Sequence, residues 1–366
     1  MPQRVVLHID LDYFYAQCEE NLNPSIRNRP VVVCVYSGRT EESGVVSTCN
    51  YKARKYGIKA GIPIIRARKL LETADAVFLP MNKPHYEDVS DRIMEILEPY
   101  GDPFEKVGID EAFLDLTHRT KGDLQQAERI AVEIKQKILE QERITCTIGV
   151  APNKLLAKIA SDRNKPNGLT VVPSENIDGF LRGLPVNKIP GVGRKTEEKL
   201  DELKAKTIDQ LAALDASVLH KTFGSNLGAY LYRAARGEDD VPVQKREQPT
   251  QFSRIATLKR NTRESSEILP LIKELASEVS KRLTERAMTC RTVGIIAILA
   301  DLSIHSKSRT LESPTYDEIT IMQTSRDLIE QFLQSMSTVT VRRVGVKLSA
   351  LSPQSGQTDI SKFMQQ

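Results

Sequence analysis

Long hydrophobic runs are absent from this 366-residue sequence. No apolar stretch approaches the roughly 20 residues that a membrane-spanning helix requires. The N-terminal residues Met1 to Arg4 lead directly into an apolar segment, without the charged and then apolar pattern of a secretory signal peptide. These two absences predict a soluble, cytoplasmic protein that does not bind a membrane.

Cysteine is also scarce, and no two cysteines form a C-x-x-C pair. An odd number of scattered cysteines excludes a disulfide framework and a zinc site of the usual spacing. We expect reduced thiols, most of them buried. The five cysteines are Cys18, Cys34, Cys49, Cys146 and Cys290.

The net charge is only +4, but it is unevenly distributed. Residues 245 to 352 contain 17 Lys and Arg against 12 Asp and Glu, so the basic surplus belongs to the C-terminal part. A basic domain joined to an acidic site is typical of a protein that holds nucleic acid in one place and reacts with it in another; an ordinary solvated surface is the alternative. The chain is longer than a domain with a single hydrophobic core usually is, so two to four domains are expected.

The clearest chemical signal is a pair of adjacent carboxylates, Asp110 and Glu111, between two short apolar runs in the segment Phe104 to Leu116. This pattern predicts a hairpin with acids at its tip. A third acid, Asp10, follows the apolar strand Val5 to Ile9. Three converging carboxylates require cations among them, acid oxygens suit Mg²⁺, and two such ions serve in-line phosphoryl transfer. The alternative is that Asp10 caps a helix and that the adjacent pair belongs to a solvated turn.

The order of the expected elements indicates how these acids meet. When residues 11 to 76 are set aside, the chain reads strand, helix, strand, strand, helix, strand, which is the ferredoxin-like arrangement with the first strand beside the central hairpin. This fold alone establishes no activity, because many ferredoxin-like domains are binding modules. Besides the hairpin, the expected strands are 5–9, 29–36, 44–48, 77–79 and 145–150, and the expected helices are 12–21, 50–56, 64–72, 85–100, 123–142 and 153–161.

The helix expected at residues 50–56 places Tyr51 and Arg54 on one face, since they are three residues apart. A planar guanidinium beside a phenol hydroxyl is well suited to binding phosphate oxygens. The alternative is an ordinary solvated helix face.

The segment Leu184 to Leu200 reads as a helix, a glycine-rich turn with Gly191 and Gly193, and a second helix beginning near Arg194. This is the helix-hairpin-helix pattern, in which glycines let backbone N–H groups approach a DNA phosphate. A purely structural turn between two helices fits the same residues.

The C-terminal part repeats the order of the N-terminal elements after a polar tether with two prolines at 237–251. The expected strands are 252–259, 292–300, 303–311 and 338–348, with helices at 266–286 and 318–334. These strands carry basic residues, about half of which alternation would place on one exposed face that contacts phosphate backbones. The basic residues are Arg254, Lys259, Lys307, Arg309, Arg342 and Arg343.

Four motifs together carry a family resemblance. They are D-L-D-Y-F-Y-A-Q-C-E-E from Asp10, N-Y-K-A-R-K-Y-G from Asn50, V-G-I-D-E-A-F-L-D from Val107 and K-P-N-G from Lys165. In kind, order and separation these motifs resemble the Y-family DNA polymerases, in particular the archaeal lesion-bypass enzymes of the DNA polymerase IV type. The resemblance extends from about residue 4 to about residue 350.

The resemblance implies an α+β multidomain enzyme, a template-directed, low-fidelity and weakly processive DNA polymerase for translesion synthesis without proofreading. No part of the chain is left for an exonuclease domain of ordinary size. The implied domains are a ferredoxin-like palm (1–10 and 77–168), inserted fingers (11–76), a helical thumb with the helix-hairpin-helix (169–236), a linker (237–251), a β-α-β-β-α-β little finger (252–350) and a flexible tail (351–366).

The same resemblance assigns roles to individual residues. Asp10, Asp110 and Glu111, with the backbone carbonyl of Leu11, would bind two Mg²⁺ ions. Tyr15 would be a steric gate whose ring excludes a 2′-hydroxyl, although aromatic residues at such positions are more often core filling. The remaining dNTP ligands would be Thr48, Tyr51, Arg54 and Lys165, and the DNA contacts would be Gly191, Gly193, Arg254, Lys307, Arg309, Arg342 and Arg343.

The C-terminal tail suggests a protein partner. Gln357, Ile360 and Phe363 have the spacing of the peptide that binds sliding clamps (357–364), although Met364 stands where a second aromatic is usual. Residues three apart share one face of a helical turn, so the two apolar side chains can enter one pocket. A frayed terminus is the alternative. The expected partners of a monomeric enzyme are therefore primer-template DNA, a dNTP and a sliding clamp.

Two other classes of protein share part of this pattern. Another two-metal palm nucleotidyl transferase, such as a nucleotidyl cyclase, has the acids but needs neither a helix-hairpin-helix nor a basic C-terminal domain. A non-catalytic DNA-binding protein would tolerate loss of the acids. The four motifs occurring together favour the polymerase.

Overall fold

The computed structural model describes residues 3–245, 249–336 and 338–354. It divides into two compact units, each with its own buried apolar clusters. The first unit contains Met1–Cys34, Val46–Ile62 and Ala67–Arg246, and the second contains Val35–Val45, Pro63–Arg66 and Glu247–Gln366.

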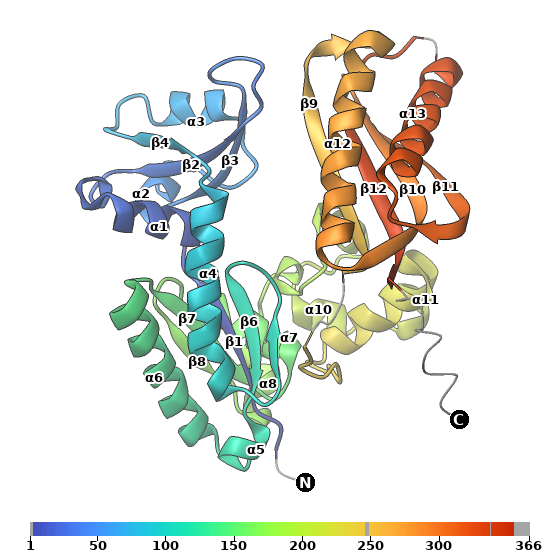
Figure 1. Ribbon diagram of the computed structural model, residues 1–366. Coiled ribbons are helices and arrows are strands. Elements are labelled where there is room, and N and C mark those ends of the chain that lie inside the picture. Colours follow the sequence, from blue (N-terminus) through green and yellow to red (C-terminus); the bar gives the residue numbers. More distant parts are fainter. Residues whose placement is uncertain (1–2, 246–248, 337, 355–366) are drawn as a thin grey trace, which may run out of the picture. The chain divides into compact units, whose positions relative to one another are not determined.

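The first unit is built around a five-stranded sheet with the strand order β5-β6-β1-β7-β8. β1 lies in the centre, antiparallel to both β6 and β7, as predicted for a ferredoxin-like arrangement (Figure 1). The strands are β1 (Val6–Leu11), β5 (Phe104–Lys106), β6 (Glu111–Asp115), β7 (Cys146–Ala151) and β8 (Leu169–Val171), and the helices against the sheet are α4 (Lys83–Leu97), α6 (Leu124–Glu142) and α7 (Lys154–Ser161).

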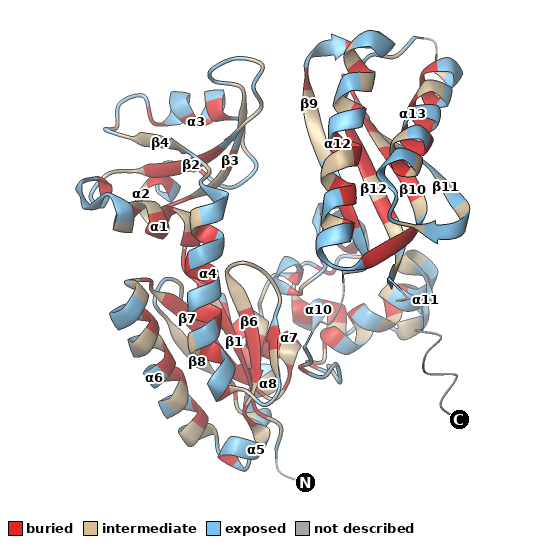
Figure 2. Cartoon of the chain, viewed as in Figure 1, coloured by how far each residue is buried: buried red, intermediate tan, exposed pale blue. Residues whose placement is uncertain are grey.

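Alternation along β1 explains why both faces of this sheet are covered. Leu7 and Ile9 are buried in the cluster that includes α4 and α6, whereas Val6 points the other way into the cluster that includes α7. Figure 2 shows β1 and β7 coloured as buried along most of their length. Asp10, near the end of β1, is therefore the residue of this strand that is not fully buried.

Side-chain caps fix where the helices around the sheet begin. Asp123 accepts hydrogen bonds from the backbone N–H groups of Gln125 and Gln126, so α6 begins at the predicted place. The helix α1 (Phe14–Leu22) begins later than predicted, because Tyr13 has a left-handed backbone with φ of 37° and ends the preceding extended segment. The side chain of Asp12 caps no helix.

A small sheet with the order β3-β2-β4 forms the insertion between β1 and α4. β4 pairs in parallel with β2, so the expected palm boundary at residue 77 moves to the end of β4. The elements are β2 (Val31–Tyr36), β3 (Gly44–Cys49), α2 (Tyr51–Arg54), α3 (Ile64–Leu70) and β4 (Val77–Pro80).

The helical segment that follows β8 differs from expectation at one point. The turn with Gly191 is preceded by a single 3₁₀ turn, Val186–Lys188, and not by a full helix. The helix after the turn begins at Arg194 as predicted. The α helices here are α8 (Ile177–Leu181), α9 (Arg194–Glu202), α10 (Ile208–Ala212) and α11 (Ala216–Ala234), and α5 (Thr117–Thr120) lies earlier, after β6.

The first half of the segment 237–251, predicted as an extended linker, packs against the first unit. Val243 is only 2% exposed. The backbone N–H of Gln244 donates to the buried carboxylate of Glu105 at 3.2 Å, and Lys154 pairs with the same carboxylate at 2.5 Å.

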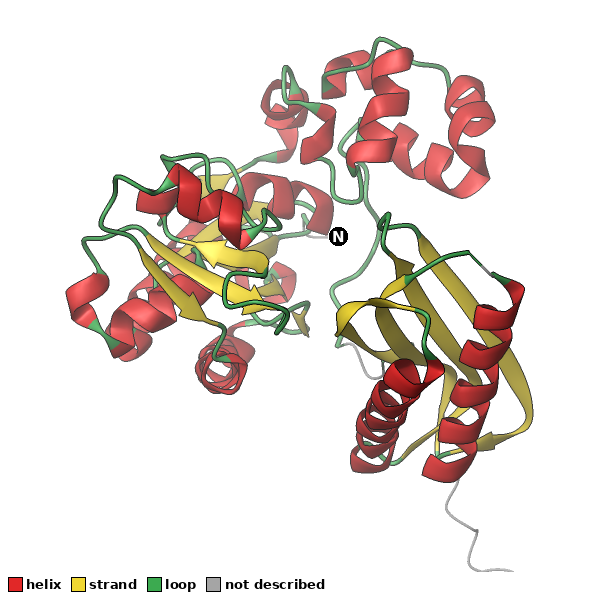
Figure 3. Cartoon of the chain, turned by 90° about the horizontal axis from the view of Figure 1, so that it is seen from above, coloured by secondary structure: helices red, strands yellow, loops and turns green. Residues whose placement is uncertain are grey.

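The second unit contains a four-stranded antiparallel sheet with the order β11-β10-β12-β9. Both of its helices lie on one face, which leaves the other face uncovered by helices (Figure 3). The predicted order of elements is confirmed, with β9 (Gln251–Thr262), α12 (Ser265–Glu285), β10 (Met288–Leu299), β11 (Ile304–Thr315), α13 (Glu318–Ser335) and β12 (Val341–Pro353).

Candidate active site

The three predicted acids meet at one end of the central strands of the five-stranded sheet. Asp10, near the end of β1, lies directly opposite Glu111, the first residue of β6. The backbone N–H of Leu11 donates to the carbonyl of Asp110 at 2.9 Å, so the hairpin tip is bound to β1. Opposite residues of an antiparallel pair share a face, so this register brings the Asp10 and Glu111 side chains together.

Two of these carboxyl groups are held in a poorly solvated place. Burial raises the pKa of Asp10 to about 6, although Lys165, whose Nζ lies 2.8 Å from Asp10 Oδ1, acts in the opposite direction. Burial and the neighbouring charge of Glu111 also raise the pKa of Asp110. A site that disfavours its own negative charges is stabilised by added cations.

Glu111 has a different environment, created by two residues that sequence reasoning missed. A hydrogen bond with His8 and contact with the Lys158 ammonium lower the pKa of Glu111 to about 2. His8 Nε2 lies 3.3 Å from Glu111 Oε2, and burial lowers the pKa of His8 to about 4, so its ring is neutral at neutral pH. The sequence does indicate His8 as a neighbour of the acids, because His8 and Asp10 are two residues apart on one strand and share a face.

The residues present suit divalent cations. Among the described residues no three His, Cys, Asp or Glu side chains are arranged to hold a metal ion. Asp10 and Glu111 are instead paired with the ammonium groups of Lys165 and Lys158, which shows that this point attracts positive charge. Carboxylate oxygens without sulfur suit Mg²⁺, and binding requires these carboxylates to change partners.

A basic and phenolic cluster begins where α2 starts. Asn50 caps this helix by accepting from the N–H of Ala53, which places Tyr51 and Arg54 on one face. The Arg54 guanidinium lies 4.5 Å from the centre of the Tyr51 ring and donates to the carbonyl of Cys49. Within the described residues the buried Tyr51 hydroxyl has no hydrogen-bond partner, which is costly unless a ligand supplies one.

Family models match most of the chain. The impB/mucB/samB family model matches residues 9–162, and the model for the C-terminal domain of that family matches residues 249–360. A model described as the thumb domain of DNA polymerase iota matches residues 187–239.

Curated relatives match over their full length. DNA polymerase IV of Nitrosopumilus maritimus is 44% identical over 99% of this chain and 100% of that protein, and DNA polymerase IV of Methanosarcina acetivorans is 45% identical over the same shares. The chain belongs to the Y family of DNA polymerases. It is therefore a DNA-directed DNA polymerase of the translesion class, as the four motifs predicted, and the family is metal-dependent.

Solved structures of Y-family polymerases agree with this assignment and with the predicted fold class. A Y-family chimera described as Dbh-Dpo4(243-245)-Dbh has a TM-score of 0.89 at 39% identity, covering 95% of this chain and 99% of that one. DinB from Sulfolobus solfataricus has a TM-score of 0.64 at 38% identity, covering 94% and 98%. No helix in the described part of this chain is long and apolar enough to cross a membrane.

In the fingers, Tyr15 lies close to this site. The Tyr15 ring is stacked on Tyr86, with centroids 4.5 Å apart and planes 13° apart. Burial raises the pKa of Tyr15, and the charge of Asp110 contributes, so the ring lies near the acids. Thr48 lies on β3, the strand that leads into α2.

In the thumb, the turn before α9 has the backbone expected of a helix-hairpin-helix. Gly191 has φ of 86°, a left-handed conformation that favours glycine, and Gly193 immediately precedes the helix. The Tyr230 hydroxyl of α11 donates to the carbonyl of Pro190 at 2.6 Å and holds the turn.

In the little finger, some of the predicted DNA contacts face the helices. Arg254 Nε lies 2.8 Å from Glu278 Oε2 of α12, and Arg309 Nη1 lies 3.1 Å from Asp327 Oδ2 of α13. Lys307 is opposite the buried Ile295, so it shares that face. These three basic residues therefore share the face that the helices cover, and their role as DNA contacts stays a prediction.

Arg343, one of the predicted DNA contacts, lies on the face of the sheet that no helix in the described part of this unit covers. Val344, Val346 and Leu348 are buried against the helices, so Arg343 and Lys347 point to the opposite face by alternation. Arg343 Nε is buried without a partner among the described residues. Sequence reasoning missed Lys347. Arg342 lies at a register shift between β12 and β9, and Lys259 is exposed on β9.

Proposed function

We propose that Asp10, Asp110 and Glu111, with the backbone carbonyl of Leu11, hold two Mg²⁺ ions for template-directed DNA synthesis. The observation that supports this most directly is the register that sets Asp10 opposite Glu111 and binds Asp110 to Leu11. When bound, the two ions would activate the primer 3′-hydroxyl and neutralise the triphosphate charge. Ions held by these carboxylates would favour in-line attack of the 3′-oxygen on the α-phosphate, with pyrophosphate as the leaving group.

The dNTP is bound next to the acids, by residues of α2 and of the turn that carries Lys165. Tyr51, Arg54 and Lys165 donate to the triphosphate oxygens, which gives the unpartnered Tyr51 hydroxyl an acceptor. Thr48 adds a hydroxyl. Tyr15 stacks beneath the sugar and excludes a 2′-hydroxyl. Small side chains on β3 cover the new base pair loosely, which accounts for low fidelity.

Primer-template DNA is held away from the chemistry. The N–H groups around Gly191 and Gly193 bind one phosphate backbone, and the basic little finger binds further along the duplex. Solved relatives are described as ternary complexes, which supports binding of DNA and nucleotide by this chain. We propose a weakly processive monomer.

Primer extension with Mg²⁺ and a single dNTP tests the metal assignment. Asp110→Ala removes a proposed ligand and should abolish extension, while the affinity for primer-template remains within about twofold, since the acids do not contact the duplex. Extension by this variant at the wild-type rate would refute the site.

The sliding clamp is proposed as a partner of the tail. Gln357, Ile360 and Phe363 lie outside the described residues. Tethering to a ring on DNA raises the local concentration of the enzyme at the primer end. Deleting 357–366 should leave distributive extension unchanged and remove stimulation by a loaded clamp; equal stimulation of both forms would exclude the tail as the docking segment.

A further inference from the structure

The turn that carries Lys165 is anchored from one side by a buried carboxylate. Asp12 is 1% exposed and lies just beyond the end of β1. Its Oδ2 accepts from the backbone N–H of Asn167 at 2.7 Å and from the Thr145 hydroxyl at 3.0 Å. Its Oδ1 accepts from the Thr147 hydroxyl at 2.7 Å.

The contact with Thr147 extends the anchor to the next residue of the turn. The N–H of Gly168 donates to Thr147 Oγ1 at 3.3 Å. Asp12 therefore holds two consecutive backbone N–H groups of the turn, one directly and one through a hydroxyl. A buried carboxylate that accepts from three donors holds the groups that it binds in place.

A half-buried lysine also anchors this turn. Lys135, on α6, donates from Nζ to the side-chain oxygen of Asn167 at 2.8 Å and to the carbonyl of Gly168 at 3.1 Å. Its third contact is the carbonyl of Cys146 at 2.6 Å. All three ammonium donors are thus used inside the protein, and none is left for a ligand.

Both anchors converge on Asn167, whose backbone is left-handed with φ of 56°. Asparagine tolerates this conformation better than most residues, and its N–H and side-chain oxygen are both used. Two residues earlier, Lys165 Nζ lies 2.8 Å from Asp10 Oδ1 and 2.9 Å from Asp162 Oδ1. The direction of Lys165 is therefore set by a turn that Asp12 and Lys135 clamp.

We propose that Asp12 and Lys135 are positioning residues for dNTP binding, which hold the 165–168 turn so that Lys165 meets the triphosphate. This inference rests on the proposed role of Lys165 as a phosphate ligand. Neither residue contacts the dNTP. A displacement of about 1 Å at a binding group can reduce activity by as much as about a hundredfold, so loosening the turn has a measurable effect.

The primary test is Lys135→Met, which keeps the length of the side chain and removes its donors. The KM for dNTP should rise on the order of tenfold with a smaller change in kcat, because Lys165 binds the triphosphate in both ground and transition states. The affinity for primer-template should be unchanged. An unchanged KM in the folded variant overturns the proposal.

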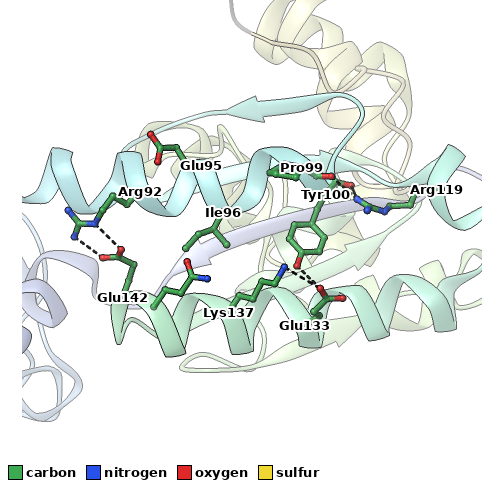
Figure 4. A pocket seen from close by; sticks show the side chains of 10 residues that line it. Arg92, Glu95, Ile96, Pro99, Tyr100, Arg119, Glu133, Lys137 and Glu142 are labelled. Carbon is green, nitrogen blue, oxygen red and sulfur yellow. Dashed lines mark hydrogen bonds and ion pairs between the residues drawn. The ribbon is translucent and has the colours of Figure 1, made fainter.

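Lys137→Met is the matched control. Lys137 lies on the same helix and points into the surface groove between α4 and α6, where it pairs with Glu133 at 3.4 Å beside Tyr100 (Figure 4). This variant should leave the KM for dNTP at the wild-type value. If the KM for dNTP rises as much as in Lys135→Met, then any substitution on α6 affects dNTP binding, and the specific role of Lys135 is overturned.

A second variant, Asn167→Gly, keeps the test decisive if Lys135→Met does not fold. Asn167→Gly keeps the N–H that Asp12 binds and favours the positive φ, but it removes the oxygen that Lys135 binds. It should raise the KM for dNTP severalfold without loss of thermal stability. A wild-type KM for this variant overturns the contribution of Lys135 even if Lys135→Met does not fold.

Double variants separate this inference from the proposed function. If Lys135 acts through Lys165, then Lys135→Met should add little to the effect of Lys165→Ala, whereas independent effects would multiply. A wild-type KM for Lys165→Ala refutes its role as a phosphate ligand. A raised KM for Lys165→Ala with multiplicative effects in the double variant overturns the positioning role alone.

Discussion

The palm sheet and the little-finger sheet use the same order of elements but give their strands different neighbours. In the palm the first strand, β1, is central and lies between β6 and β7. In the little finger the first strand, β9, lies at an edge, and β10 and β12 are central. Because β1 is central, it ends beside the hairpin that carries Asp110 and Glu111. β9 lies at an edge and pairs with β12 only.

The positions of charge follow from this difference. The palm register gathers Asp10 and Glu111 at one point, where repulsion and burial favour cations. In the little finger, Arg343 and Lys347 lie about 13 Å apart along β12, with Gly345 between them. One sheet concentrates negative charge for chemistry, and the other spreads positive charge over a surface suited to phosphates.

Glu111→Gln tests the acid cluster of the palm and should reduce activity more than any change described below. The amide keeps the shape but removes one charge of the acid cluster, so kcat should fall by about a thousandfold or more in single-turnover extension with Mg²⁺. Primer-template affinity, measured in parallel, should stay at the wild-type value. A kcat near wild type would show that Glu111 is not part of the cation site.

Tyr15→Ala tests the residue that we propose selects the sugar of the nucleotide. Removing the ring relieves the clash with a 2′-hydroxyl, so ribonucleotide incorporation should rise on the order of a hundredfold relative to deoxyribonucleotide use. Competition between the two nucleotides at one template position measures this ratio. An unchanged ratio would place the gate at Tyr13 or Phe14.

Replacing both Arg343 and Lys347 with Ala tests the little-finger side. Loss of two phosphate contacts should weaken primer-template binding about tenfold and reduce the slope of log K against log salt by about 2 units, with kcat unchanged. Fluorescence anisotropy over a salt series measures both.

The matched control for that pair is the replacement of Arg254 and Arg309 with Ala. Both side chains pair with helix carboxylates, so the salt slope should be unchanged while thermal stability falls slightly. The reverse result would mean that the helix-covered side of the sheet faces the DNA.

The smallest expected effect concerns pH and stability of the metal-free enzyme. Burial raises the pKa of Asp10 to about 6 above its ordinary 3.8, so ionised Asp10 destabilises the fold, increasingly from pH 4 to pH 6 and fully above that. In EDTA, Asp10→Asn should therefore raise the melting temperature by about a few degrees at pH 7.5 and less at pH 4.5. A larger gain at pH 4.5 would contradict the sign of this shift.

The acids, their meeting point and the order of elements in both sheets could be predicted from the sequence. Local patterns sufficed, because a buried strand that runs into Asp10 and a hairpin that carries Asp110 and Glu111 are each written in a few residues. The motif around Asn50 likewise placed Tyr51 and Arg54 on one face.

The covered face of each strand and the surroundings of each charge depend on contacts between elements that are far apart in the sequence. Alternation divides the basic residues of the little finger into two sets. Only the positions of α12 and α13 show that Arg254 pairs with Glu278, whereas Arg343 Nε has no partner in the part of the chain that the structure describes. The strand order, with β9 at an edge, is also set by packing of whole elements. Asp12 reads locally as a helix start, yet its partner Asn167 lies 155 residues away, and no local pattern encodes a contact at that separation.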